Sequence, residues 1–503
     1  MTDHPITEVR SDDTAPGRPT EGRPTATRVP AIPTGDKLVI AILLVAVFVV
    51  ILNETIMGVA LPRLMTALDI EASTGQWLST AFMLTMAVVI PTTGFLLQRL
   101  TTRAVFVLAM TLFCVGTLAA GLAPNFWLLL VARVVQGSGT AIMLPLLMTT
   151  ILVLVPIERR GVVMGNVSIA ISVAPAIGPT VSGLILQFLS WRFMFLIVAP
   201  IALAALVFGA IRLTNIGERG HVPLDLRSVL LTVPAFGLVV LGLSRFGESR
   251  TTTGLVAAVA LFAVGVVCLV GFGFRQRRLQ RDDGALLDLR AFTYPMFSRS
   301  VAMLCIAMIG LFGVVILLPI YLQTIRGLGS LSTGLLLLPG GLLMGILGPV
   351  VGRLFDRYGP RGLSVFGGLA LVVAMWRFST VDAETSVGML LALHLGLSLG
   401  LACLFTPAFT TALNPLPPYL YSHGSAILST LQQVAGAAGV ALLVTIMAGR
   451  SQVLVARGVA PLLATTEGIQ AAFLVAAIIS VGAVVLAFSL RKTGAAEVAE
   501  PAR

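Results

Sequence analysis

Three ionisable residues stand inside long apolar runs of this sequence, and their types suit proton chemistry. Glu54 follows Asn53 in the run that opens at Leu38, Arg133 stands in LLLVARVVQGSGTA, and His394 stands in LLALHLGLSLG. A charge at the middle of a bilayer costs roughly 3 kcal/mol even on the gentlest scale, so such residues are functional candidates. A carboxylate and an imidazole can bind and release a proton, whereas a guanidinium stays charged and can stabilise a nearby carboxylate.

The composition identifies the class of chain that carries these residues. The protein has 503 residues, of which 57% are hydrophobic and 11% charged, and its mean hydropathy is +0.99. These values indicate a polytopic membrane protein. A spanning segment must satisfy its own backbone, as a helix or a closed barrel, and the apolar runs here have about 20 residues, as helices require. We therefore expect an all-α membrane protein.

Fourteen apolar runs are long enough to span a bilayer. An even number places both termini on one side, and Arg residues concentrate in the loops on that side, which indicates cytoplasmic termini. The formal charge of +11 does not indicate nucleic-acid binding, because the basic residues are scattered through short loops. The predicted spans cover about 38–62, 76–98, 104–122, 126–156, 161–187, 193–213, 226–245, 254–275, 297–322, 331–352, 362–380, 386–411, 424–448 and 468–490.

A weak internal repeat divides the chain. GFLLQRLTTR at 94–103 and GRLFDRYGPR at 352–361 both join two spans through a short basic turn. Repeated halves with a site at their interface are typical of transporters. The predicted parts are a disordered tail (1–36), a six-helix bundle (37–213), a linker with two extra spanning helices (214–292), a second six-helix bundle (293–490) and a tail (491–503).

Glu54 and Arg133 are predicted to lie at similar depths. At 1.5 Å per residue, Glu54 lies about 12 Å and Arg133 about 10 Å from the outer ends of their spans. One interpretation is a buried ion pair that only fixes two helices. The other is that Glu54 carries a proton, with apolar burial and Arg133 acting on it in opposite directions.

Other embedded polar residues have two interpretations each. His394 suits a proton relay, but a lone His in a membrane often only hydrogen-bonds a neighbouring backbone. Gln136 and Gln433 are as consistent with interhelical hydrogen bonds as with substrate contacts. Phe82 and Met86, in AFMLTMAVVI, suit a weakly selective substrate site because such side chains repack easily, although core packing is their commoner use.

Small residues concentrate in the fifth span, GNVSIAISVAPAIGPTVSGLI, which contains Gly165, Gly178, Pro179 and Gly183. Small side chains let helix backbones approach closely, and Gly-Pro bends a helix locally. The plain interpretation is close packing. The sharper one is a hinge-like seam that seals the leak between the two halves.

At these residues the chain resembles the major facilitator superfamily, and within it the fourteen-span drug:proton antiporters. The segment from Leu52 to Pro62 aligns with the family's first-span motif, but the family's Asp is Asn53 and its Asn is Gly58 here. The family's Arg motif matches Arg133, Gln136 and Gly137. Its antiporter motif fits Gly165, Gly178, Pro179 and Gly183, with Ala174 and Ser182 as substitutions. Its loop motif is intact at Gly352, Leu354, Asp356, Arg357, Gly359 and Arg361, whereas Gln98 and Thr101 replace its Asp and Gly in the first half.

The resemblance implies the major facilitator fold, two six-helix bundles plus two extra helices, with a cavity lined by spans one, four, nine and twelve. It implies a part in proton coupling for Arg133, and Glu54 and His394, which also stand on these spans, are the other candidates for proton coupling. Asn53, Gln136, Phe82, Met86 and Gln433 are the candidate substrate-cavity residues. The resemblance further implies the antiporter motif and a gating loop at Asp356, Arg357 and Arg361.

The leading functional hypothesis is therefore proton-driven export of a small hydrophobic or cationic compound from a bacterial cell, across the plasma membrane. Protons, the substrate and the lipid bilayer are the expected partners; no cofactor, metal ion or nucleic acid is expected, and no adaptor protein is identified. Export or flipping of an endogenous lipid or metabolite is the alternative. A membrane enzyme or sensor fits worst, because the sequence shows no nucleophile with a base, no phosphate loop and no metal-ligand cluster.

Overall fold

The structure, a computed structural model, describes residues 33–70, 72–215, 225–248, 252–282 and 284–492. Within these ranges, fourteen helical segments are long and apolar enough to cross a membrane. Each coincides with one of the predicted spans, so the predicted all-α membrane fold is confirmed. The predicted tails 1–36 and 491–503 lie mostly outside the described residues.

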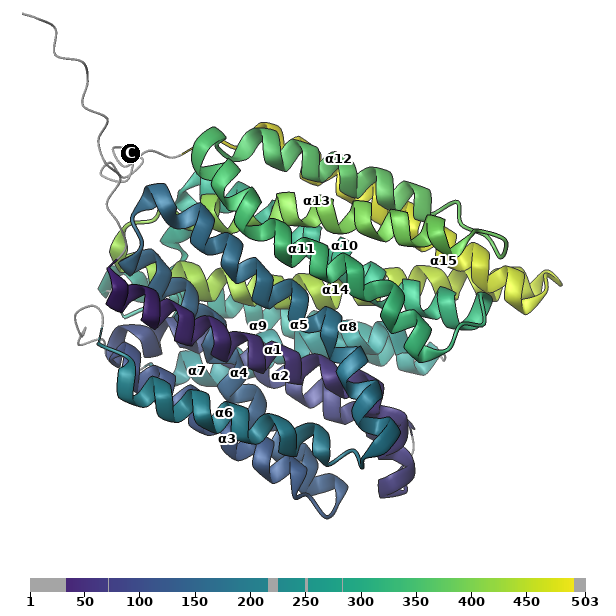
Figure 1. Cartoon of the computed structure of the whole chain (residues 1–503), viewed down its shortest axis with the longest axis horizontal. Helices are drawn as coiled ribbons and strands as arrows, with labels where there is room; N and C mark the ends of the chain where they lie inside the picture. The colour runs from purple at the N-terminus through teal and green to yellow at the C-terminus, as the bar shows by residue number, and fades with distance from the viewer. Residues whose placement is uncertain (1–32, 71, 216–224, 249–251, 283, 493–503) are drawn as a thin grey trace, which may run out of the picture. The chain divides into compact units, whose positions relative to one another are not determined.

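The first six helices form one group, in which the first four and the sixth pack on one another and the fifth packs on the first and, most extensively, on the second helix of the other group (Figure 1). Two of them begin at side-chain caps, where Thr101 accepts a hydrogen bond from Ala104 N at 3.2 Å and Asn125 accepts one from Leu128 N at 2.9 Å. Such caps satisfy backbone donors that the first turn leaves free. The helices are α1 (Thr34–Leu68), α2 (Ala72–Arg99), α3 (Thr102–Gly121), α4 (Phe126–Leu154), α5 (Arg160–Phe188, after the short η1, Ile157–Arg159) and α6 (Phe193–Arg212).

The last six helices form a second group with a similar pattern of contacts, except that its last two helices pack extensively on each other, whereas α5 and α6 barely touch. Pro319 interrupts the first helix of this second group, and a π-helical turn follows, as expected where a residue without an N–H enters the hydrogen-bond ladder. They are α10 (Pro295–Ile320, with η5, Tyr321–Ile325), α11 (Ser330–Tyr358), α12 (Pro360–Phe378), α13 (Val387–Leu413), α14 (Tyr421–Ala456, after η6, Pro418–Leu420) and α15 (Pro461–Phe488).

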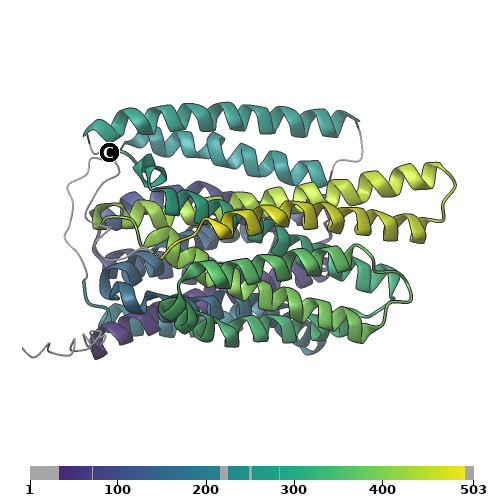
Figure 2. The same ribbon diagram turned by 90° about the horizontal axis from the view of Figure 1, so that it is seen from above.

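Between the groups the chain forms the extra helix pair. α7 (Leu226–Thr232), the π-helical η2 (Val233–Gly237) and α8 (Leu238–Glu248) make one span, and α9 (Thr252–Leu279) makes the other. α8 contacts α14 and α2, whereas α9 packs on α8 and η2 (Figure 2). The short turns η3 (Gln280–Asp282) and η4 (Leu289–Thr293) lead on to α10.

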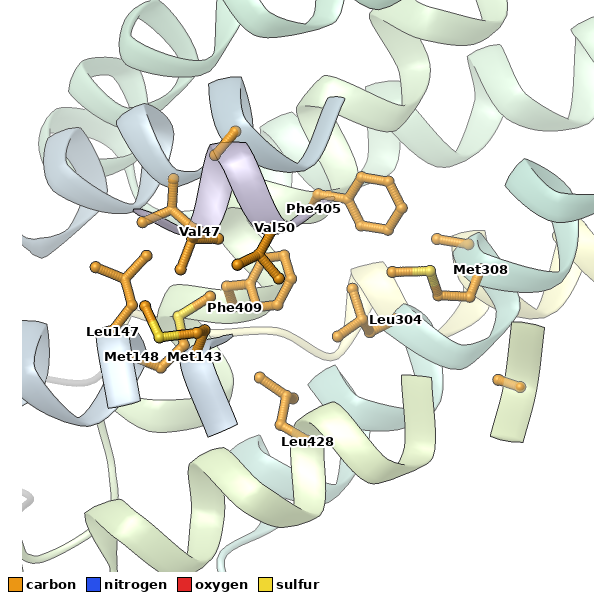
Figure 3. Packing of buried hydrophobic residues seen from close by; sticks show 14 of the residues in the cluster. Val47, Val50, Met143, Leu147, Met148, Leu304, Met308, Phe405, Phe409 and Leu428 are labelled. Carbon is orange, nitrogen blue, oxygen red and sulfur yellow. The ribbon is translucent and has the colours of Figure 1, made fainter. Parts of the chain in front are cut away.

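The two groups meet in an apolar core. Figure 3 shows side chains of α1, α4, α10, α13 and α14 packed in this core, and the exposed fraction of each labelled residue is at most 6%. The labelled residues are Val47, Val50, Met143, Leu147, Met148, Leu304, Met308, Phe405, Phe409 and Leu428. We call the end of the helices that carries Arg99, Arg160, Asp356 and His423 the base.

Some predicted boundaries are wrong. α1 begins at Thr34, so the last residues of the predicted tail are helical. α14 runs from Tyr421 to Ala456 and α15 begins at Pro461, well beyond the apolar runs that predicted them. The extension is stabilised between the two helices, since Ser451 Oγ donates to Ala464 O at 3.0 Å and Arg450 pairs with Glu467 at 3.2 Å.

Candidate functional site

Glu54 lies near the middle of α1 and is partly exposed. Its carboxylate has no hydrogen bond or ion pair with any described residue; its electrostatic partner is Arg133. The preceding residue, Asn53, is only 2% exposed, and neither atom of its side-chain amide has a hydrogen-bond partner among the described residues. The carboxylate of Glu54 and the amide of Asn53 therefore lie on different sides of α1, and the carboxylate is the more exposed of the two.

Arg133 lies on α4 and is 1% exposed. Its Nη1 donates to Gln136 Oε1 at 2.6 Å, and its Nε donates to Leu78 O at 3.4 Å. Its Cζ lies 4.0 Å from the centroid of the Phe82 ring, in cation–π geometry. The predicted closeness of Glu54 and Arg133 is seen as an electrostatic interaction, but they form no ion pair within 4.0 Å. Arg133 is thus held by α2 and α4 without using the acid.

Gln136 and Phe82, predicted as cavity residues, are in this interior. Gln136 is 0% exposed, and its Nε2 donates to Thr117 Oγ1 on α3 at 2.7 Å. Phe82 and Met86 pack with Ile90 in a small buried cluster. Gln433 on α14 is partly exposed. In this state of the protein, Gln136, Phe82 and Met86 support Arg133 and the packing of α2 on α4.

His394, on α13, makes its contacts within the second group of helices. Its Nε2 lies 3.1 Å from Leu337 O on α11, and its Nδ1 is buried without a hydrogen-bond partner among the described residues. Ser398 lies one turn further along α13, and both side chains pack where Gly340 has no side chain of its own. His394 therefore has the backbone hydrogen bond that is common for a histidine in a membrane.

The small residues of α5 form a seam with α11. Gly165 contacts the backbone of Gly348, and a Cβ on Gly165 would lie 2.9 Å from Pro349 Cα, so the two backbones touch here. Gly178 contacts Thr55 of α1 instead, where a Cβ would lie 2.9 Å from Thr55 Cβ. A Cβ on Gly183 would meet open space. The side chain of Pro179 lies outside the described residues.

At the base, Asp356 of α11 joins the start of α5. Its carboxylate accepts hydrogen bonds from Gly161 N at 3.0 Å and Val162 N at 3.1 Å. An anion at a helix N-terminus meets free N–H groups and the positive end of the helix dipole. The other two predicted gating residues, Arg357 and Arg361, are exposed.

Arg160 adds a second connection at the same end. It is 6% exposed and donates to Leu152 O at 2.6 Å and to Val155 O at 3.0 Å, the carbonyls at the end of α4. It also donates to Asn414 Oδ1 at 3.1 Å and to Tyr421 Oη at 3.2 Å, on the other side of the interface. Both halves thus share one buried guanidinium.

The first-half counterpart of Asp356 is Gln98, and it has an equivalent position. Gln98 Nε2 lies 2.8 Å from His423 Nε2, in the first turn of α14. A Cβ on Gly94 would lie 3.2 Å from the His423 ring, just as Gly352 contacts the first turn of α5. His423 is not among the site residues predicted from the sequence. The replacement of the family's Asp by Gln98 is the one feature of the sequence that points to it, because an amide at this position needs a different partner from a carboxylate.

The structure also has a groove away from Glu54 and Arg133. This groove, of about 960 Å³, lies at the end opposite the base, lined by Asp382, Glu384, Arg450 and Glu467 among others, and no residue of α1 or α4 lines it. Among the described residues, no group of three or more His, Cys, Asp or Glu could hold a metal ion.

Comparison with known proteins agrees with this architecture. The chain is 37% identical over 94% of its length, and 98% of the relative's, to an uncharacterized transporter, YcnB, of Bacillus subtilis (strain 168). It is 39% identical over 90% of its length, and 95% of the relative's, to the lincomycin resistance protein LmrB of the same organism. The structure of the human organic anion transporter MFSD10 matches 90% of this chain and 100% of that one, with a TM-score of 0.62 and 15% identity, a likeness of fold.

The family model of the Major Facilitator Superfamily matches residues 43–440, which include most of α1, all of α4, α5 and α11, and the first part of α14. The match therefore covers the partly exposed acid, the buried Arg and the glycine seam. With helices in two groups of six and homologous transporters aligned over nearly its whole length, the chain belongs to the Major Facilitator Superfamily of membrane transporters.

Proposed function

We propose that this protein is a proton-coupled antiporter that exports hydrophobic or cationic drugs or antibiotics across the cell membrane. The observation that carries the proposal is the state of Glu54, a partly exposed carboxylate in the middle of a spanning helix without a hydrogen-bond partner among the described residues. Arg133 acts on it through space while bonding to Gln136. An acid in such a position can gain and lose a proton without breaking a bond.

The base supports an alternating-access mechanism. If the base is the cytoplasmic end, as its arginines indicate, then Asp356, Arg160 and the Gln98–His423 contact close the cytoplasmic side in this structure. Rocking the two halves apart at the base would break these contacts together. Glu54 would then exchange its proton with the cytoplasm, and the substrate would enter from there.

The proposed substrate class rests on the relatives and on the apolar residues of the central helices. Lincomycin resistance is the role printed for a relative that aligns over 90% of this chain. Met143, Met148, Met308 and Phe405 lie where the two halves meet (Figure 3). Such side chains adapt to differently shaped apolar molecules, which favours a drug over a small polar metabolite.

The test uses the purified protein in proteoliposomes with an imposed pH gradient and a panel of cationic and neutral antibiotics. We expect gradient-driven transport in the wild type and its loss in Glu54→Gln, because the amide cannot release a proton. Asp69→Asn is the matched control, since Asp69 is exposed at the end of the same helix. Undiminished gradient-driven transport in Glu54→Gln would rule out the coupling role. Transport of lipid species alone would favour the alternative of an endogenous substrate.

A further inference from the structure

Arg133 stands at one end of a fixed chain of hydrogen bonds that leads away from Glu54. Arg133 Nη1 donates to Gln136 Oε1, Gln136 Nε2 donates to Thr117 Oγ1, and Thr117 Oγ1 donates to Phe113 O at 2.6 Å. The exposed fractions of Arg133, Gln136 and Thr117 are 1%, 0% and 0%. Water does not compete for these bonds in this state, so each partner depends on the next.

The chemistry of the groups sets the direction of the chain. A guanidinium can only donate, so the side-chain oxygen of Gln136 must face Arg133 and its NH₂ must face Thr117. The Thr117 hydroxyl must then accept from Gln136, and its own proton goes to the carbonyl of Phe113. These bonds therefore define the orientation of the Gln136 amide.

The backbones of α3 and α4 hold the ends of the chain in register. A Cβ on Gly116 would lie 2.5 Å from the backbone N of Gln136 and 2.7 Å from its Cα. One turn away, a Cβ on Gly139 would lie 2.6 Å from the backbone N of Phe113. Glycine at these two contacts lets the helices touch, which places the Thr117 hydroxyl directly against the amide of Gln136.

We infer that Thr117 is a positioning residue for proton coupling: by fixing the amide of Gln136, it holds the guanidinium of Arg133 away from Glu54 and leaves that carboxylate unpaired. The inference rests on the proposed role of Glu54 as the proton carrier and adds a residue on α3 to it. Thr117 itself bonds only to Gln136 and Phe113 among the described residues, so it would act on the acid through Arg133.

The charges around Glu54 determine what loss of the Thr117 hydroxyl would do. The helices packed against α1 are α2, α4, α5 and α6, and Arg133 of α4 is the charged group that acts on Glu54. Without the Thr117 hydroxyl, the buried NH₂ of Gln136 has no acceptor, and the amide turns to find one. Its oxygen then leaves Arg133 Nη1, and the guanidinium moves toward the nearest anion, Glu54.

The experiment follows the carboxyl of Glu54 directly, in the full-length protein in lipid nanodiscs. Infrared difference spectra are recorded across a pH series, and subtraction of the Glu54→Gln spectra identifies the protonated-carboxyl band of Glu54. In Thr117→Val the band should reach half intensity about one pH unit lower than in the wild type, because a paired carboxylate keeps its charge to lower pH. Thr117→Ser keeps the hydroxyl and should titrate as the wild type does.

An unchanged or raised midpoint in Thr117→Val would overturn the inference. If this variant does not fold, Gln136→Leu removes the middle of the chain and is expected to shift the midpoint in the same direction. The band reports the carboxyl and not transport, so this result stays separate from the test of the proposed function. Loss of coupling in Glu54→Gln concerns what the acid does, whereas the midpoint concerns where Arg133 lies.

Discussion

Asn53 and Glu54 are neighbours in the sequence but differ in their surroundings. Asn53 occupies the position of the acid in the related family and is 2% exposed, whereas Glu54 is partly exposed. One residue turns a helix by about 100°. In this protein the acid therefore lies on the more exposed side of α1, and the buried position next to it carries a neutral amide.

This difference predicts that the acid cannot be moved to the position of Asn53. In the double variant Glu54→Gln, Asn53→Asp, we expect no return of gradient-driven transport, because a carboxylate at the buried position costs roughly 3 kcal/mol and has no described hydrogen-bond partner there. Transport in proteoliposomes and the melting temperature are the measurements. Glu54→Asp, which keeps an acid on the more exposed side, is the control and should retain part of the activity. Full recovery in the double variant would show that either side of α1 serves.

The sequence predicted that Glu54 and Arg133 lie close together but not what surrounds them. Depth along the helices was enough to bring Glu54 near Arg133, since both distances follow from helix geometry. Thr117 could not be found in this way, because its role depends on contact between α3 and α4. That contact depends in turn on Gly116 and Gly139, which do not differ in the sequence from other glycines of spanning helices.

At the scale of the elements, the base is closed by two contacts that correspond in position but differ in chemistry. α11 presents the Asp356 carboxylate to two N–H groups of α5, whereas α2 presents the neutral amide of Gln98 to His423 of α14. Hydrogen bonds to a charged group contribute about 1.5–3 kcal/mol and neutral ones about 0.5–1.5 kcal/mol. The α5–α11 side should be the stronger contact.

We therefore expect Asp356→Asn to open the base more than Gln98→Ala does. Spin labels on cysteines at Arg99 and Arg357, which are exposed at the base on opposite halves, report the separation in a background without native cysteines. The ratio of open to closed molecules should rise by about tenfold in Asp356→Asn, which corresponds to about 1.4 kcal/mol, and by less in Gln98→Ala. A larger opening in Gln98→Ala would contradict this order of strengths.

Element boundaries were predictable where lipid alone determines a helix. The spans from α2 to α13 follow the apolar runs within a few residues at most ends. α14 and α15 are longer than their apolar runs because each supports the other beyond them, through Ser451 and the Arg450–Glu467 pair. Hydropathy measures preference for lipid and does not detect such contacts between helices.

At the scale of the whole molecule, a polar cluster fastens the extra helix pair to the remainder of the chain. Asp225 pairs with Arg275 at 2.8 Å, and Gln276 of α9 donates to Ser228 and accepts from Leu286 N at 2.7 Å. Leu286 belongs to the segment that leads to Asp288 and Arg290, and both of these act electrostatically on His423. The extra helices and the α2–α14 contact are thus joined by one continuous set of described interactions.

The Asp225–Arg275 pair predicts a pH dependence of stability. Hydrogen bonding from Arg275, more than any other cause, lowers the pKa of Asp225 below its usual value of 3.8. A lowered pKa in the folded state adds stability above the unfolded value, and this is lost as pH falls through the folded one. Thermal unfolding should show Asp225→Asn less stable than wild type by at most about 1 kcal/mol at neutral pH, as the pair is partly exposed.

This difference should shrink as the pH falls below about 4, where Asp225 in the unfolded chain becomes protonated. Glu384→Gln, at an exposed carboxylate, is the control and should track the wild type at every pH. A constant difference between Asp225→Asn and wild type down to the acid limit would mean that the pair contributes through packing and not through charge.

The glycine seam between α5 and α11 has a mechanical consequence. Where Gly165 faces Gly348 the two backbones touch, and further along the seam only the short side chains of Val173 and Ala176 pack against glycines of α11. Contacts between such small groups let two helices change their crossing angle while they remain close. If the two halves rock about this seam, as the proposed transport cycle requires, the close contact would keep the barrier along it closed.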